Sequence, residues 1–182
     1  QLIHRARFGR TRALWRTLNS QQKATWASNL HDVRSRPSLG QDGSLPPYLV
    51  FVKVNATLAA QGLPPVLTRP QPHTFPANPV GELVATNTGG VAELKLPVST
   101  TPATDILVLG AAPCSAGVSF ANHFVILGRL PAPEAGYSSI RKLYVDRYGE
   151  PAAGTRIFIR TRQVRDGWGD FPIQTTAIIP QP

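Results

Sequence analysis

Cysteine, methionine and charge are all scarce in this chain of 182 residues. Its single cysteine, Cys114, excludes an internal disulfide, so the fold must be held together by packing. Charged residues make up only 16%, below the usual quarter of a soluble domain. The sequence has no run of about 18 apolar residues, the minimum for a membrane-spanning helix. Because methionine is missing even at the first position, we expect the true start of the protein to lie upstream.

Proline and basic residues are abundant by comparison. The 18 prolines argue against a mostly helical protein, because proline breaks helix interiors. The net charge of +9 comes mainly from residues 1–36, where eight basic side chains stand against Asp32 alone. The other 146 residues are close to neutral, with eleven basic and nine acidic side chains. The basic character is therefore mainly a property of the N-terminal region.

Residues 1–62 are predicted to form a basic helical region. Asn19 and Gln22 have the spacing of a capping box, which starts a second helix after a first one. Apolar side chains repeat at helical spacing in both: Leu14, Trp15 and Leu18 in the first helix, Trp26 and Leu30 in the second. We expect Trp15 and Trp26 to pack against each other across this helical hairpin.

Residues 48–61 fit either a strand or a helix. The valines favour a strand, whereas Asn55 and Leu58 belong to an apolar pattern of helical period, and Gly62 offers a helix stop. We favour the helix. Residues 63–79 contain six prolines and are predicted to be a semi-rigid extended arm. The arm is either an ordinary linker or a segment that docks on a neighbouring subunit.

Residues 80–182 contain short strand-like runs separated by turn signals, as is typical of an antiparallel β-sandwich. The predicted strands include VGELVATNT, VAELKLPV, TDILVLGAAP, HFVILGRLP, RIFIRTRQV and IQTTAII, whereas SSIRKLYVDRYG is a strand or a short helix. In RIFIRTRQV, Ile157 and Ile159 alternate with arginines. The fold class predicted for the whole chain is α+β.

The last hundred residues resemble a fibronectin type III domain. The resemblance lies in GTRIFIRTRQVRDGWGDFPIQTTAII, which is similar to the last hairpin of that family, although no tryptophan stands in the second strand. The resemblance implies an immunoglobulin-like sandwich. The whole chain also resembles uncharacterised bacterial and phage-associated proteins, through Trp15, Leu18, Gln22 and Trp26, followed by Phe51, Asn55, Leu58, Gly62 and Pro64. This second resemblance implies a structural part of a virion, particle or cell surface.

The sequence carries no convincing catalytic or metal-binding motif. The four histidines lack the short spacing of zinc ligands, and PCSAG around Cys114 has Pro113 where a nucleophile elbow needs glycine. The carboxylates are mostly isolated, which disfavours a paired acid and base. We therefore predict a protein that is not an enzyme and needs neither a cofactor nor a metal.

The favoured hypothesis is a structural or interaction subunit of a larger assembly, which contacts copies of itself or other subunits. Its predicted interface residues are Trp15, Trp26, Leu67, Phe75, Arg156, Phe158, Arg160 and Arg162. One alternative is a nucleic-acid-binding module that uses Arg5, Arg7, Arg10, Arg12 and Arg16 as polyanion contacts. Another is a carbohydrate-binding module with the loop aromatics Tyr137, Trp168 and Phe171. A virion, particle or extracellular surface is the expected location.

Overall fold

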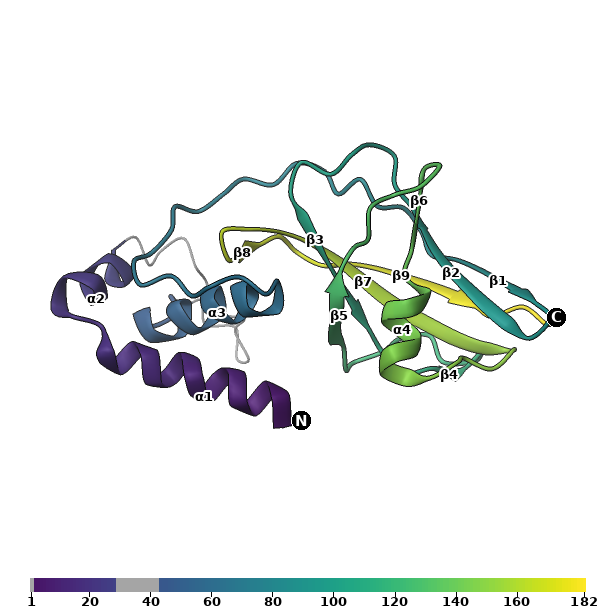
Figure 1. Cartoon of the computed structure of the whole chain (residues 1–182), viewed down its shortest axis with the longest axis horizontal. Helices are drawn as coiled ribbons and strands as arrows, with labels where there is room; N and C mark the ends of the chain where they lie inside the picture. The colour runs from purple at the N-terminus through teal and green to yellow at the C-terminus, as the bar shows by residue number, and fades with distance from the viewer. Residues whose placement is uncertain (1, 29–42) are drawn as a thin grey trace. The chain divides into compact units, whose positions relative to one another are not determined.

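The computed structural model describes residues 2–28 and 43–182, with side chains from residue 9 onward (Figure 1). The chain divides into two compact units. The first contains residues 1–73 together with 166–168, and the second contains residues 74–165 and 169–182. The boundary falls within the segment predicted to be a proline-rich arm. The architecture of helices and antiparallel sheets confirms the predicted α+β class.

The described residues of the first unit contain three helices: α1 (Leu2–Thr17), α2 (Ser20–Ala27) and α3 (Pro47–Ala60). The predicted capping box is present, because Asn19 accepts from the Gln22 backbone and the Gln22 side chain accepts from the Asn19 backbone. Pro47 begins α3, where its missing N–H costs nothing. Gly62 follows the helix with a φ of +74°, a conformation that favours glycine. The helical prediction for residues 48–61 is thus confirmed.

Aromatic rings hold these helices together. Phe51 of α3 lies 5.2 Å from the Trp15 ring and 5.1 Å from the Trp26 ring, measured between centroids. Trp15 also contacts Tyr48 at 5.8 Å. The expected packing of Trp15 on Trp26 is therefore corrected: both tryptophans pack on a ring that the third helix supplies. Phe51 and Trp26 are fully buried as a result.

Residues 66–70 of the proline-rich segment are attached to this unit by side-chain bonds to their backbone. Asn55 donates to the Val66 carbonyl at 3.2 Å and accepts from the Val66 N–H at 2.8 Å. The Trp26 indole donates to the Leu67 carbonyl, and the Trp168 indole donates to the Pro70 carbonyl. This part of the segment therefore runs along its own unit.

The second unit contains two antiparallel sheets and one helix. Its elements are β1 (Val84–Thr88), β2 (Val91–Pro97), β3 (Asp105–Gly110), β4 (Cys114–Ser115), β5 (Val125–Arg129), β6 (Tyr137–Ser139), α4 (Arg141–Tyr148), β7 (Thr155–Arg165), β8 (Trp168–Gly169) and β9 (Ile173–Ile178). One sheet has the order β1-β2-β6. In the other, β7 pairs with β3 and β4 and also with β9, and β5 pairs with β3. The segment predicted as a strand or short helix thus contains the last two residues of β6 and the whole of α4.

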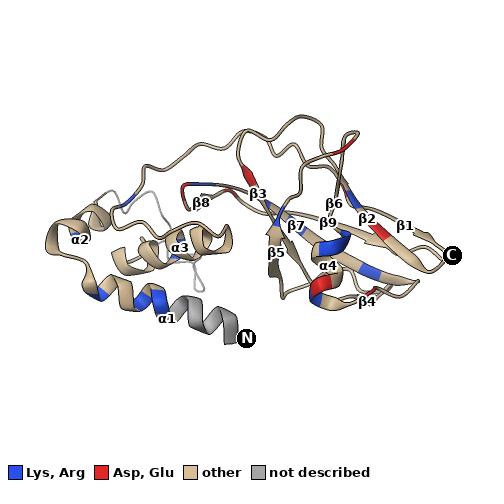
Figure 2. Ribbon diagram, viewed as in Figure 1, with Lys and Arg blue, Asp and Glu red and all other residues tan. Residues whose placement is uncertain are grey.

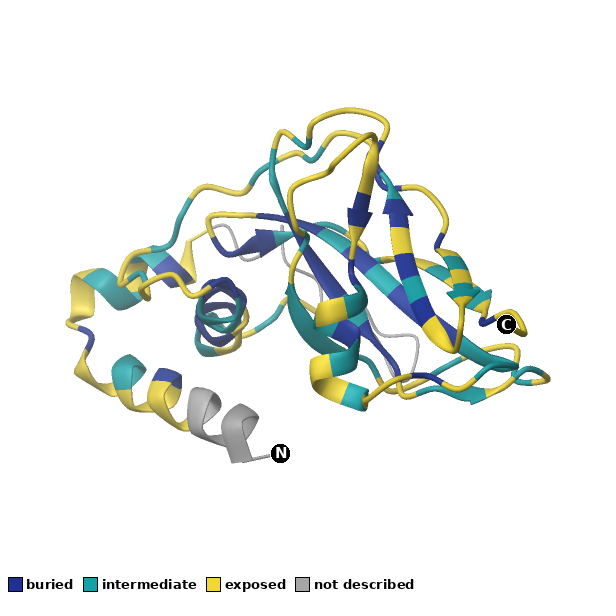
Figure 3. Ribbon diagram, turned by 45° about the vertical axis from the view of Figure 1, so that its right-hand side comes forward, coloured by how far each residue is buried: buried dark blue, intermediate teal, exposed yellow. Residues whose placement is uncertain are grey.

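The two sheets share one apolar core. Leu94 and Leu96 of β2 face inward, as do Ile157 and Ile159 of β7, and all four are fully buried. Tyr144 of α4 belongs to the same cluster. The alternation of buried and exposed residues along the strands is visible in Figure 3. It gives each sheet an inner and an outer face, as the period-2 pattern of the sequence predicted.

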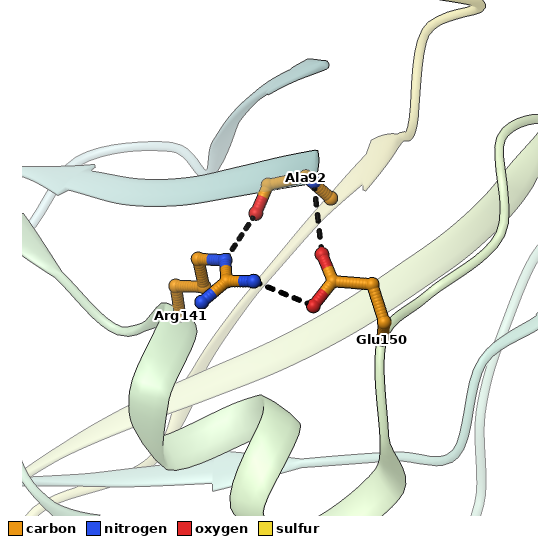
Figure 4. A network of polar contacts seen from close by, with 3 residues as sticks. All are labelled: Ala92, Arg141 and Glu150. Atoms are coloured by element: carbon orange, nitrogen blue, oxygen red, sulfur yellow. Dashed lines mark hydrogen bonds and ion pairs between the residues drawn. The ribbon is translucent and has the colours of Figure 1, made fainter. Parts of the chain in front are cut away.

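Side chains complete the edge of β2 beyond its short partner β6. Arg141 donates to the Ala92 carbonyl at 3.0 Å, and Glu150 accepts from the Ala92 N–H at 2.9 Å (Figure 4). Arg141 and Glu150 are joined by an ion pair of 2.7 Å. These two side chains occupy hydrogen-bonding positions that a longer strand would fill, and they fix both ends of α4 to the sheet.

Candidate interaction surface

The outer face of the larger sheet carries a row of arginines, which we call the arginine face: Arg156, Arg160 and Arg162 of β7 and Arg129 of β5. The three arginines of β7 point away from Ile157 and Ile159, as predicted. Register places Arg129 on the same face, because it lies opposite Leu107, and Leu107 lies opposite Arg162. Sequence reasoning missed Arg129, since its position depends on the pairing of separate strands.

Neutral acceptors of the chain hold each of the three β7 arginines in place. Nε of Arg156 donates to the Ala116 carbonyl at 2.9 Å. Nε of Arg160 donates to Oε1 of Gln174 at 3.0 Å, and Nη2 of Arg162 donates to the Gly169 carbonyl at 3.1 Å. Among the residues that the structure describes, none of these three arginines forms an ion pair with a carboxylate. Their positive charge is therefore oriented but not neutralised.

A loop over residues 116–124 borders the arginine face. Its start accepts the bond from Arg156, and at its end the Phe124 ring lies 3.8 Å from the guanidinium carbon of Arg160. Phe158 stands between these two arginines on β7 and is fully buried. The prediction that Phe158 offers itself to a partner is therefore wrong. The exposed aromatic of this region is Phe120 in the loop, at 62% exposure.

Arg162 is the most enclosed member of the row. Burial lowers its pKa, while the nearby charge of Asp170 acts in the opposite direction. Its Nε atom is buried without a hydrogen-bond partner. An arginine nevertheless stays charged near neutral pH, because its ordinary pKa lies so far above that range. Arg156 and Arg160 are consequently the members better placed to meet a partner, since neither has an orphaned buried nitrogen.

The N-terminal helix presents a second basic surface. Arg10, Arg12 and Arg16 are exposed on α1, a helix without any Asp or Glu. Figure 2 shows the basic residues along the described part of this helix. The side chains of Arg5 and Arg7, the other predicted polyanion contacts, lie outside those that the structure describes. The spacing of the three described arginines does not form one clean stripe, as the sequence indicated.

The predicted apolar anchors differ in accessibility. Leu67 is 41% exposed, and Trp15 and Phe75 are half-buried. Trp26 is fully buried under Phe51, so its assignment as an interface anchor is corrected to a core residue.

The aromatic residues of the carbohydrate hypothesis differ in the same way. Trp168 is 8% exposed and has the Arg69 guanidinium over its ring, so it cannot stack on a sugar. Tyr137 and Phe171 are exposed. A platform that needs all three rings is therefore not available.

Other chemistry is limited in the described part of the chain. It contains no cluster of three or more His, Cys, Asp or Glu side chains suited to a metal ion. None of its helices is long and apolar enough to cross a membrane. Cys114 is half-buried, and its thiol lies 3.5 Å from the Arg156 carbonyl. His73 is bonded to Asp166 at 2.7 Å within the first unit.

The residues that carry the resemblance to bacterial and phage-associated proteins have packing roles in the first unit. Gln22 caps α2, Asn55 bonds the Val66 backbone, and Gly62 adopts a positive φ at the end of α3. Trp26 and Phe51 are fully buried. No family model, curated protein or solved structure matches the chain. The motif thus describes how the helical unit is built.

Proposed function

We propose that this protein is a non-enzymatic structural or interaction protein, a subunit of a larger assembly such as a phage particle, a filament or a surface layer. Its second unit serves as a fibronectin type III-like interaction module. The first unit is the helical appendage of the bacterial and phage-associated proteins that the sequence resembles. The expected location is a virion, a particle or an extracellular surface.

The strand order supports the fibronectin-like assignment. If β1, β2, β3, β6, β7 and β9 are taken as strands A, B, C, E, F and G, one sheet contains A, B and E and the other contains C, F and G. Immunoglobulin-like sandwiches distribute their strands in this way, and β5 pairs beside β3 as an added strand does beside C. The helix α4 between β6 and β7 is an addition to that plan.

The observation that carries the proposal is the unneutralised charge of Arg156 and Arg160 on the arginine face, where Arg129 by contrast forms an ion pair with Asp105. Arg156 and Arg160 are held by neutral acceptors, which reduces the side-chain entropy that a partner must remove on binding. Arginine presents a planar fork of donors that fits carboxylates. The partner is accordingly an acidic surface of another subunit, and complementary charge would set its orientation.

The test uses the double substitution Arg156→Gln and Arg160→Gln. Light scattering should give a smaller particle mass for the double variant than for the wild type. High salt should also lower the particle mass of the wild type. Lys95→Gln is the matched control, because Lys95 is exposed on the outer face of the other sheet. An unchanged mass for the double variant, with circular dichroism confirming its fold, would reject the arginine face as the contact.

Exposed arginines on α1 favour a second candidate function, binding of nucleic acid. Labelled single-stranded DNA should show a smaller rise in fluorescence anisotropy when it is mixed with the variant in which Arg10, Arg12 and Arg16 are replaced by Gln than when it is mixed with the wild type. Wild-type binding should fall steeply between about 50 and 200 mM salt, since neutralised phosphates release counterions. Absence of binding by the wild type at low salt would exclude this candidate.

A further inference from the structure

We propose that the free edge of β9 pairs with β9 of a second copy of this chain, in antiparallel register centred on Thr176. The proposal concerns the backbone edge of the sheet, whereas the arginine face consists of side chains; Gln174, which accepts a bond from Arg160, belongs to both. Either contact can therefore fail in an experiment while the other persists.

The register with β7 defines which backbone groups of β9 point outward. Ile178 lies opposite Arg156 and Ile173 opposite Thr161. Next to this ladder, the Ile179 N–H donates to the Thr155 carbonyl at 2.9 Å. Since the direction of N–H and C=O groups alternates along an antiparallel pair, the odd-numbered residues of β9 bond to β7. The backbone groups of Gln174, Thr176 and Ile178 therefore point away from the sheet.

This outward edge is open. Gln174, Thr176 and Ile178 are all exposed, and their outward backbone groups have no hydrogen-bond partner among the residues that the structure describes. The region around β1 forms hydrogen bonds with β9 and the residues after it, but not with these outward backbone groups. The Leu83 N–H donates to the Thr175 hydroxyl, and Asn87 donates to the Pro180 carbonyl. A row of unpaired backbone groups is a template for another strand.

The sequence of this edge is self-complementary. Pro172 and Pro180 stand equally far from Thr176 and, having no N–H, cannot extend a ladder of donors. When two copies pair antiparallel about Thr176, Gln174 of one copy faces Ile178 of the other, and each Thr176 faces its counterpart. Each outward N–H then meets an outward C=O. The prolines of the two copies face each other at both ends, where the ladder stops.

Charge also favours a second copy as the occupant. Residues 171–182 contain no charged side chain, although the chain as a whole carries +9. The excess positive charge of each copy lies mainly in residues 1–36, and this edge is a place where two copies meet without opposing like charges directly. Natural edge strands are commonly protected by lysine, by an internal proline or by a bulge. Ile173–Ile178 has no lysine and no proline inside it.

Disulfide trapping tests the register. Paired residues in a hydrogen-bonded antiparallel position have Cα atoms about 5.5 Å apart, within the range of about 4.4–6.8 Å that a disulfide spans. In a Cys114→Ser background, Thr176→Cys should therefore give a covalent dimer under mild oxidation. Gln174→Cys and Ile178→Cys should each give no covalent dimer alone, because the two copies of either residue lie about 13 Å apart along the strand. Mixed together, those two variants should form the heterodimer.

The uncrosslinked protein gives a second readout. Sedimentation equilibrium should show a dimer for the wild type and a monomer for Thr176→Lys, since two ammonium groups would face each other at the two-fold axis. Circular dichroism checks that the lysine variant is folded. The proposal is overturned by a monomeric wild type, by a dimer that Thr176→Lys does not weaken, or by equal crosslinking of all three single cysteine variants.

Discussion

Several polar side chains in this chain bond to backbone groups, and these bonds join elements that are distant in the sequence. Tyr144 donates to the Ala111 carbonyl at 3.0 Å, and Tyr148 donates to the Gly110 carbonyl at 2.9 Å. Both bonds join α4 to the end of β3. Because a buried carbonyl without a partner costs about 1–3 kcal/mol, such residues affect stability more than their number suggests.

Tyr144 should make the stability of the second unit depend on alkaline pH. Burial, helped by the nearby Tyr148 and Cys114, raises the pKa of its phenol above the ordinary value. The neutral phenol is thus favoured in the folded state. Its contribution is fully present below pH about 10, where the unfolded tyrosine also stays neutral, and is lost as the pH rises above that value.

Tyr144→Phe should lower the free energy of unfolding by about 1 kcal/mol at neutral pH, because one hydrogen bond is lost. It should also flatten the decline of stability above pH about 10. Urea denaturation at several pH values measures both effects. An alkaline decline as steep as that of the wild type would contradict the assignment.

Substitution of Asn55 should destabilise the protein more than substitution of Asn122. The Asn55 amide bonds to the Phe51 carbonyl and to both backbone groups of Val66, and the residue is buried. Asn55→Ala leaves the Val66 N–H without its acceptor, so we expect a loss of about 2–3 kcal/mol in the free energy of unfolding. Asn122→Ala, at an exposed position, should change it by less than about 0.5 kcal/mol. Equal midpoints in urea for the two variants would be the contrary result.

At the scale of helices and strands, local patterns predicted the elements well. The capping box at Asn19, the stop at Gly62 and the alternation along β7 depend on neighbours in the sequence. Contacts between distant segments were missed for a physical reason. Phe158 follows the outward period of its strand, yet it is fully buried, and one strand's sequence cannot predict what covers it.

The candidate interaction surface likewise combines features that local sequence predicts with features that depend on distant segments. The outward direction of Arg156, Arg160 and Arg162 follows from the period of a single strand. The ring of Phe124 under Arg160 and the acceptor Gln174 come from other parts of the chain. Their positions depend on strand register and on the path of a loop. These are set by the packing of the whole unit, and no local spacing in the sequence reveals them.

Gly167 lies in a turn whose backbone closely approaches Val54 and Leu58. It has a φ of +80°, and a Cβ at this position would lie 2.8 Å from the Val54 carbonyl oxygen and 3.1 Å from Leu58 Cγ. Gly167→Ala should therefore destabilise the protein through both backbone strain and overlap. Gly89→Ala is the matched control, because Gly89 has a φ of +60° with open space around it.

We expect about 1 kcal/mol of destabilisation for the Gly89 control and at least about 2 kcal/mol for Gly167→Ala, since overpacking adds to the strain. Thermal unfolding of the two variants side by side measures the difference. If both midpoints fall equally, the overlap with Val54 and Leu58 has no energetic weight.

For the whole molecule, the division into two units defines where the chain can be cut. Removal of residues 1–79 would also remove groups that belong to the second unit. The Pro76 carbonyl accepts from Gln163 at 2.6 Å, and Asn78 donates to the Thr161 hydroxyl at 3.1 Å. The fragment 74–182 keeps both bonds and the complete shared core of the two sheets. It is therefore the better test of independent folding.

Fragment 74–182 contains one tryptophan, Trp168, which belongs to the first unit and loses its neighbours there. In the full chain its indole donates to the Pro70 carbonyl and the Arg69 guanidinium lies over its ring. We expect the fragment to unfold cooperatively, because its core is intact, while its tryptophan emission is shifted to the red by exposure to water. If the shared core can fold without residues 1–73, near-ultraviolet circular dichroism should retain a tyrosine signal from buried Tyr144. An emission maximum typical of a buried indole would mean that Trp168 finds its environment within the second unit, and a fragment without a cooperative transition would mean that the two units fold only together.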